Sequence, residues 1–139
     1  MRRFLLDTGI AQDFINRRHG VLERSDAERL AGNRIGICTP VLGELWAGVE
    51  GSVSRERNLQ RLRRSLSRLV VWPYTNGAAA QFGRVFAELR RIGRPMQHID
   101  IMVAAIAFAL GNCTVVSGDT DLEAVPGLTV ENWAAGGSR

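Results

Sequence analysis

The chain has 139 residues, of which 45% are hydrophobic and 23% are charged, with a formal net charge of +4 at pH 7. This length suits one domain, and this mixture excludes a disordered or fibrous protein. The longest uninterrupted apolar run, residues 101–110, is about half as long as the roughly 20 residues that a transmembrane helix needs. Asp7 follows only three apolar residues, so no signal peptide is expected and the predicted location is the cytoplasm.

All 18 basic residues are arginines, and the sequence contains no lysine. This excludes a P-loop and a Schiff-base enzyme, because both need that side chain. It also excludes phosphoaspartate receivers and haloacid-dehalogenase-type phosphatases, which begin in a similar way but use a lysine near the phosphoryl group. The two cysteines, Cys38 and Cys113, are predicted to be buried thiols, since a disulfide or a metal site needs an oxidising compartment or more ligands.

The positive charge is concentrated in the middle of the chain. Residues 55–94 contain ten arginines against Glu56 and Glu88, a net charge of +8, whereas the remaining residues have a net charge of −4. This pattern suits a protein that attracts phosphate backbones and handles them at a carboxylate-lined site. For any single arginine, a solvated helix face is an equally simple explanation.

Short apolar segments alternate with segments of helical periodicity along the whole chain. In the first half, the predicted elements are a strand at 4–6, a helix at 10–18, a short helix capped by Ser25 or Asp26, a strand at 35–38, a helix capped by Thr39 and opened by Pro40, and an amphipathic helix at 55–69. In the second half, they are a strand at 70–73, a helix at 78–92, a loop at 94–98, an apolar helix at 100–110, a strand at 113–117, a short helical segment at 122–125 and a strand at 128–130.

This alternation predicts an α/β fold in which helices cover both faces of a parallel sheet. No linker, repeat or low-complexity segment divides the chain. Residues 1–133 are therefore predicted to form one domain, and residues 134–139 a short flexible tail.

Four acids are predicted to meet at one edge of this sheet. Asp7 and Asp119 follow predicted strands, and Glu44 and Asp100 lie near the start of predicted helices. The helix dipole explains such acids singly, but it explains Asp100 poorly, because the rest of that helix is apolar and an unpaired buried carboxylate is costly. Clustered carboxylates repel one another unless a cation lies between them, and oxygen ligands without His or Cys suit Mg²⁺ or Mn²⁺. Phosphodiester hydrolysis uses such a site.

Segments around these acids resemble the PIN domain and, more narrowly, VapC, the ribonuclease toxin of type II toxin–antitoxin modules. The likeness covers nearly the whole chain in the right order. The segments are Phe-Leu-Leu-Asp-Thr at 4–8, Gly-Glu-Leu-Trp-Ala-Gly at 43–48, Ile-Asp-Ile-Met-Val-Ala-Ala at 99–105, Val-Val-Ser-Gly-Asp-Thr-Asp at 115–121 and the ending at 126–133.

The resemblance implies a three-layer α/β/α sandwich with a central parallel sheet and a Mg²⁺-dependent endoribonuclease, with Mn²⁺ as the other candidate metal. It also implies a homodimer, neutralised by a VapB-type antitoxin and bound with it to operator DNA. Carried over by position, Asp7 and Asp100 are the firmest metal ligands, Asp119 completes the metal site, and Glu44 orients or deprotonates the attacking water. The matching supporting residues are Thr8, Ser117 and Asp121.

Two further functions remain open from the sequence. One is a non-catalytic regulator resembling the PIN-domain subunit of FitAB-type complexes, which acts by binding DNA together with an antitoxin. The other is a structure-specific DNA nuclease of the wider PIN group. Arg90, Arg91 and Arg94 precede Asp100 and are expected to contact either the RNA backbone or an acidic segment of the antitoxin.

Overall fold

A five-stranded sheet forms the centre of the molecule in the computed structural model, which describes residues 1–134. The strands lie in the order β3-β2-β1-β4-β5, and each neighbouring pair is parallel. In chain order they are β1 (Arg3–Leu6), β2 (Arg34–Cys38), β3 (Val70–Trp72), β4 (Cys113–Val116) and β5 (Thr129–Glu131). The predicted α/β class and parallel sheet are confirmed.

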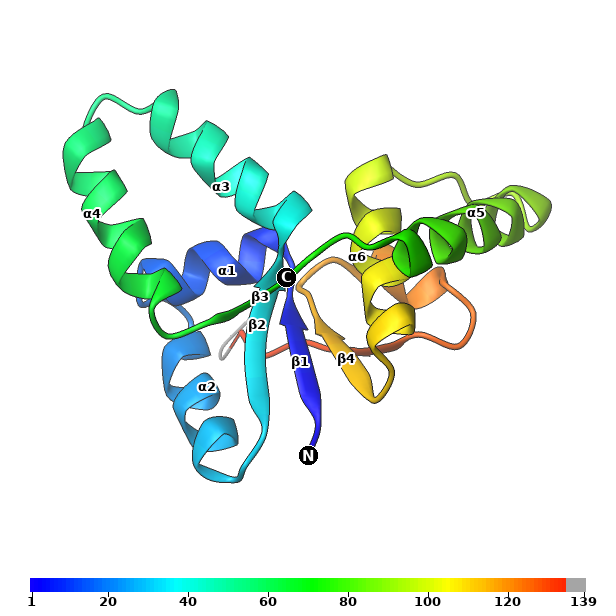
Figure 1. The fold of residues 1–139 in the computed structure, drawn as a ribbon, viewed down its shortest axis with the longest axis horizontal. Helices are drawn as coiled ribbons and strands as arrows, with labels where there is room; N and C mark the ends of the chain where they lie inside the picture. The colour runs from blue at the N-terminus through cyan, green and yellow to red at the C-terminus, as the bar shows by residue number, and fades with distance from the viewer. Residues whose placement is uncertain (135–139) are drawn as a thin grey trace.

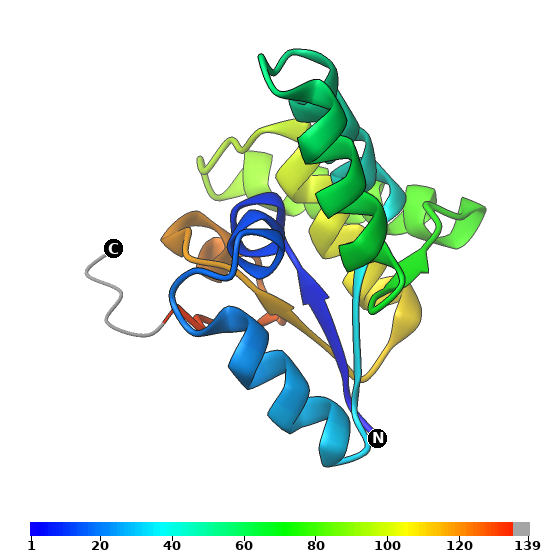
Figure 2. The same ribbon diagram turned by 90° about the vertical axis from the view of Figure 1, so that its left-hand side faces the viewer.

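Helices flank the sheet on both sides. In Figure 1, α1 to α4 lie to the left of the strands and α5 and α6 to the right. Figure 2 shows α1 between α2 on one side and the α3–α4 pair on the other. The helices of the described residues are α1 (Thr8–Ile15), α2 (Val21–Leu30), α3 (Thr39–Glu50), α4 (Arg55–Leu66), α5 (Asn76–Arg91), α6 (His98–Leu110) and the 3₁₀ helix η1 (Thr120–Ala124).

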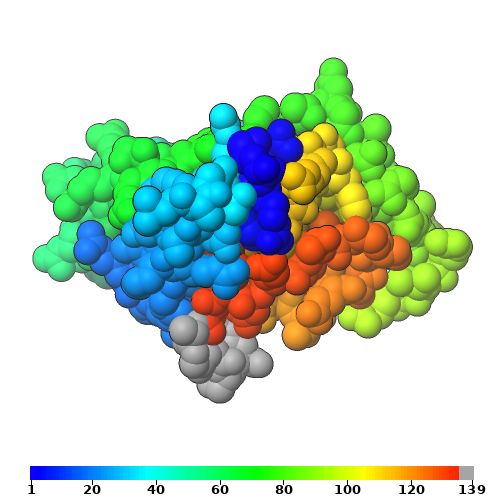
Figure 3. All heavy atoms as spheres, turned by 90° about the horizontal axis from the view of Figure 1, so that it is seen from below, coloured from blue at the N-terminus to red at the C-terminus, as the bar shows by residue number. Residues whose placement is uncertain are grey.

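The central strand β1 explains why the sequence begins with an apolar run. Phe4, Leu5 and Leu6 are fully buried, as expected for a strand of a parallel sheet that is covered on both faces. Seen from below, the first residues of the chain (blue) lie between the segment near residue 30 (cyan) and the segment near residue 112 (yellow to orange), in agreement with the pairing of β1 with β2 and β4 (Figure 3). This pairing places the ends of β1 and β4 side by side.

Several helix starts differ from the prediction, and three of them involve a predicted cap or loop. Helix α2 begins at Val21 after Gly20, which has a φ of 75°, and Ser25 is buried inside the helix instead of capping it. The N-cap of α3 is Cys38, whereas the Thr39 hydroxyl accepts a hydrogen bond of 3.2 Å from the backbone N–H of Tyr74. Helix α6 begins at His98, within the predicted loop. Tertiary contacts and backbone geometry decide where these helices start. Rules that consider only the local sequence of a helix cap do not take such contacts into account.

Both cysteines of the described chain are free thiols, as predicted; Cys38 is buried as expected, whereas Cys113 is only half-buried. Ala134, the first residue of the predicted tail, is buried, and residues 135–139 of that tail lie outside the described residues. Within residues 1–134, no helix is both long enough and apolar enough to cross a membrane.

Candidate active site

The carboxyl ends of the paired strands β1 and β4 place two acids at the same edge of the sheet. Asp7 follows β1 directly and caps α1, since its Oδ1 accepts a hydrogen bond of 2.9 Å from the N–H of Ile10. Asp119 lies three residues after β4 and caps η1, since its Oδ1 accepts a hydrogen bond of 2.9 Å from the N–H of Asp121. Capping accounts for the local conformation at both positions, and the sheet topology brings them together.

A pocket of about 390 Å³ opens at this edge. The four predicted acids Asp7, Glu44, Asp100 and Asp119 all line it, although they come from four separate parts of the chain. Gln97, the N-cap of α6, also lines the pocket and was not predicted. The sequence signal that could have identified Gln97 is its position just before a helix that starts at this edge of the sheet. Acids far apart in the sequence therefore share one site.

Ser117 links two of these acids. Its hydroxyl donates a hydrogen bond to Oδ2 of Asp7 and accepts one of 2.9 Å from the backbone N–H of Asp119. Ser117 is itself buried, with 3% of its surface exposed. A buried hydroxyl with partners on both sides fixes the orientation of the Asp7 carboxylate.

Thr8 performs a similar role on the other side of the pocket. Its hydroxyl donates a hydrogen bond of 2.6 Å to Oε1 of Glu44, and so joins the first turn of α1 to α3. Glu44 is exposed to solvent. The hydrogen bond holds this exposed side chain at the pocket.

Asp100 is an acid of the pocket whose pKa is raised by its surroundings. Burial, followed by the negative charges of nearby acids, raises the pKa of Asp100 from 3.8 to about 6; in decreasing order of effect, these acids are Asp119, Asp7, Glu44 and Asp121. The helix start by itself would stabilise the charged form. The surroundings therefore favour a proton or a cation at Asp100.

The donor set fits a hard divalent cation, because it consists of carboxylate, hydroxyl and amide oxygens. As these side chains stand, however, no three His, Cys, Asp or Glu residues within residues 1–134 converge closely enough to form a ready-made metal site. Asp7, Glu44 and Asp119 are each held by a hydrogen bond of their own. Binding of a cation would need small side-chain movements around the pocket.

The remaining predicted residues are Arg90, Arg91, Arg94 and Asp121. The guanidinium of Arg94 is 3.8 Å from Oδ1 of Asp121, and both side chains are exposed. Arg90 and Arg91 are exposed in the last turn of α5. None of these four residues lines the carboxylate pocket. Asp121 lies in the first turn of η1, and Asp119 is the N-cap of that helix.

Comparison with known proteins places this geometry in a family. The PIN domain model matches residues 4–128. The chain is 36% identical over 135 residues to a protein of Shigella flexneri named "tRNA(fMet)-specific endonuclease VapC", with 96% of this chain and 100% of the relative covered. A Salmonella typhimurium protein of the same name is 35% identical over 134 residues, with coverage of 96% and 99%.

Solved structures agree with these relatives. The chain matches DNA-bound VapBC from Salmonella typhimurium with a TM-score of 0.87 and 35% identity, over 96% of this chain and 99% of the other. FitAcB from Neisseria gonorrhoeae, with a TM-score of 0.75 and 22% identity over 93% and 96% of the two chains, shares the fold. The sequence and the structure together show that this chain belongs to the PIN domain family and, within it, to the VapC proteins.

Proposed function

We propose that this chain is the toxin of a type II toxin–antitoxin module and hydrolyses RNA phosphodiester bonds as a metal-dependent endoribonuclease. The observation that supports this most strongly is the pocket lined by Asp7, Glu44, Asp100 and Asp119. It lies in a PIN domain whose relatives at 35% and 36% identity are named as tRNA endonucleases. The relatives' name makes initiator tRNA the first substrate to test.

Each side chain of the pocket has its own role in the proposed reaction. Asp7, Asp100 and Asp119 would hold the cation, for which Mg²⁺ is the first candidate and Mn²⁺ the second. When bound, such a cation supplies a Lewis acid that offsets the charge developing on the attacked phosphate. Glu44 orients or deprotonates the attacking water, and the hydroxyl of Thr8 holds Glu44 in place at 2.6 Å.

Residues at the edge of the pocket support this site. Ser117 orients Asp7, and Asp121 together with Arg94 forms an ion pair near the carboxylates. Arg90, Arg91 and Arg94 would contact the RNA backbone or an acidic segment of the antitoxin, because an arginine binds a phosphate or a carboxylate with two parallel hydrogen bonds.

The partner is a VapB-type antitoxin. The Salmonella typhimurium structure that this chain resembles, with a TM-score of 0.87, is a VapBC complex bound to DNA. We extend that assembly to this chain as a homodimer that binds its antitoxin and, with it, operator DNA in the cytoplasm.

The test compares the wild-type chain with Asp100→Asn after brief expression in bacteria. The proposal expects growth arrest and new RNA 5′ ends for the wild type, and neither for Asp100→Asn. Purified wild-type protein should cleave initiator tRNA when Mg²⁺ is added and should leave matched DNA intact. Arrest that persists in Asp100→Asn without RNA cleavage would contradict the proposal and favour action by DNA binding. Cleavage of DNA at the same rate as RNA would identify a structure-specific nuclease instead.

A further inference from the structure

Four arginines surround a hollow outside the carboxylate pocket, which we name the arginine pocket. Its volume is about 570 Å³, and Arg17, Arg18, Arg61 and Arg64 line it. Two of them come from the turn after α1 and two from α4, where they lie three residues apart on one helix face. No Asp or Glu of the described residues lines this hollow.

These four guanidinium groups have no acidic partner within residues 1–134. None of them takes part in an ion pair there, whereas Arg55, Arg68 and Arg84 are all paired with carboxylates. Asp13, a carboxylate on the neighbouring helix α1, is buried and paired with His19 at 3.1 Å. Four unpaired positive charges around one hollow attract a polyanion.

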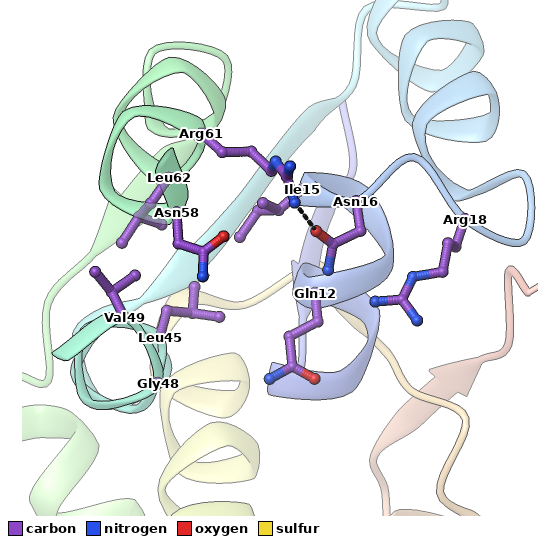
Figure 4. Close-up of a pocket in the computed structure, with 10 residues that line it drawn as sticks. All are labelled: Gln12, Ile15, Asn16, Arg18, Leu45, Gly48, Val49, Asn58, Arg61 and Leu62. Atoms are coloured by element: carbon purple, nitrogen blue, oxygen red, sulfur yellow. Dashed lines mark hydrogen bonds between the residues drawn. The ribbon is translucent and has the colours of Figure 1, made fainter. Parts of the chain in front are cut away.

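The backbone of the turn holds Arg17 and Arg18 beside α4. Arg17 has a φ of 55° and His19 a φ of 59°, a left-handed conformation that is uncommon for residues other than glycine. Arg61 reaches across from α4 and donates a hydrogen bond of 3.0 Å to Oδ1 of Asn16 (Figure 4). The two halves of the pocket are therefore tied together.

A second hollow leads from the arginine pocket toward the carboxylates. It has a volume of about 300 Å³ and shares Ile15, Asn16, Arg18 and Arg61 with the arginine pocket. Figure 4 shows the amide side chains of Gln12, Asn16 and Asn58 along it, together with apolar side chains of α3 and α4.

This hollow approaches the carboxylate pocket along two helices, although the two hollows share no lining residue. On α1, its Gln12 lies one turn from Thr8 of the carboxylate pocket, and on α3 its Gly48 lies one turn from Glu44. From Thr8 to Asn16 the distance along the helix axis is about 12 Å at 1.5 Å per residue. A nucleic-acid strand with its scissile phosphate at the carboxylates would reach the arginines within a few nucleotides.

We propose that the arginine pocket binds the RNA backbone a few nucleotides from the scissile bond, while the amides between the two sites face the intervening bases. This inference rests on the proposed function, since it names a substrate-binding surface for the same reaction. Arginine suits this role because its planar guanidinium binds phosphate with two hydrogen bonds. The pocket positions the substrate and does not touch the reacting atoms.

The experiment measures binding and cleavage separately. Binding of fluorescein-labelled initiator tRNA is measured in Ca²⁺ at several salt concentrations, with Asp100→Asn as the background. The test variant is Arg61→Gln with Arg64→Gln. The matched control is Arg63→Gln with Arg34→Gln, which removes the same charge from exposed arginines that do not line the pocket. A third variant, Arg61→Lys with Arg64→Lys, keeps the charge and loses the bidentate geometry.

The proposal expects the test variant to bind the tRNA about 10-fold more weakly, with a salt slope smaller by about 1.5, as the loss of two phosphate contacts requires. The control should change affinity less than 2-fold, and the lysine variant should keep the wild-type slope. When the two arginine substitutions are made in protein that retains Asp100, they should raise KM for tRNA cleavage about 10-fold and leave kcat within about 2-fold of the wild-type value. Arg64→Gln alone retains the Arg61–Asn16 hydrogen bond and should show about half of the slope change.

Two results would overturn this inference. Equal losses in the test and control variants would mean that only net charge matters. Wild-type tRNA binding by the test variant, combined with weaker binding of an acidic antitoxin segment, would assign the pocket to a protein partner. Failure of the proposed function is a different result, because wild-type protein would then leave RNA intact whatever these binding measurements show.

Discussion

The hydroxyl of Thr8 lies 2.6 Å from Oε1 of Glu44 and connects the start of α1 to the middle of α3 across the carboxylate pocket. This hydrogen bond orients the acid that we assign to the attacking water. Thr8→Ala should lower kcat for RNA cleavage about 10-fold and leave KM unchanged, as the loss of a supporting hydrogen bond does in other sites. Thr8→Ser keeps the hydroxyl and should restore most of the rate. Single-turnover cleavage of initiator tRNA measures both, and equal rates for Thr8→Ala and wild type would show that Glu44 needs no such support.

The repulsion around Asp100 has a consequence for stability in the absence of divalent cations. Its pKa is about 6 in the folded protein, above the value of about 3.9 in the unfolded chain. The folded state therefore binds more protons than the unfolded state between pH 4 and pH 6, so the free energy of unfolding falls as the pH rises through this window. Asp100→Asn removes that loss. In EDTA it should raise Tm by about 2–4 °C at pH 7.5, which corresponds to about 1 kcal/mol after allowance for the half-exposed carboxyl, and leave it unchanged near pH 4.

Thermal unfolding at both pH values measures this effect. Glu23→Gln is a suitable control, because Glu23 is exposed on α2 and does not line the carboxylate pocket. A lower Tm for Asp100→Asn at pH 7.5 would mean that the Asp100 carboxylate stabilises the fold and is not strained.

The cysteines should be chemically inert in the native protein. Burial raises the pKa of Cys38 to about 11 and that of Cys113 to about 12, so the reactive thiolate is scarce at neutral pH. Both thiols should react with a disulfide reagent at least about 100-fold more slowly in the folded protein at pH 7.5 than in urea. Single Cys→Ser variants assign each kinetic phase of this reaction to one of the two thiols. Rapid modification of Cys113 in the folded state would show that the start of β4 opens frequently.

Gly36 is required by the close packing of β2 against β3. A Cβ at this position would overlap the carbonyl oxygen of Val70 and lie 2.8 Å from Cζ3 of Trp72. Gly36→Ala should therefore lower the free energy of unfolding by about 2–4 kcal/mol, because paired backbone cannot move aside without loss of strand pairing. Gly83→Ala on α5 is the matched control, since a Cβ there meets no atom within 4 Å, and it should stabilise the protein by up to about 1 kcal/mol. Urea unfolding compares the two, and equal midpoints would refute the packing argument.

Much of the site was predictable because its acids occur at recognisable local positions. Asp7 follows an apolar run, and Asp100 is an isolated charge at the start of an apolar helix. The rule that parallel strands end at a common edge then brings them together. The hydrogen bonds from Ser117 and Thr8 were expected only as supporting contacts, because their partners depend on side-chain rotamers that sequence patterns do not determine.

Local patterns by themselves determined the class of fold, the approximate strands and the identity of the four acids, because apolar periodicity and turn residues act over a few neighbouring positions. Only the tertiary structure decided that Arg17 and Arg18 lie beside Arg61 and Arg64, more than 40 positions away in the chain. It also decided that α2 begins at Val21 and that Asp100 has the raised pKa. These features arise from contacts between helices and from the summed charges of distant segments, which have no signature within any one stretch of sequence.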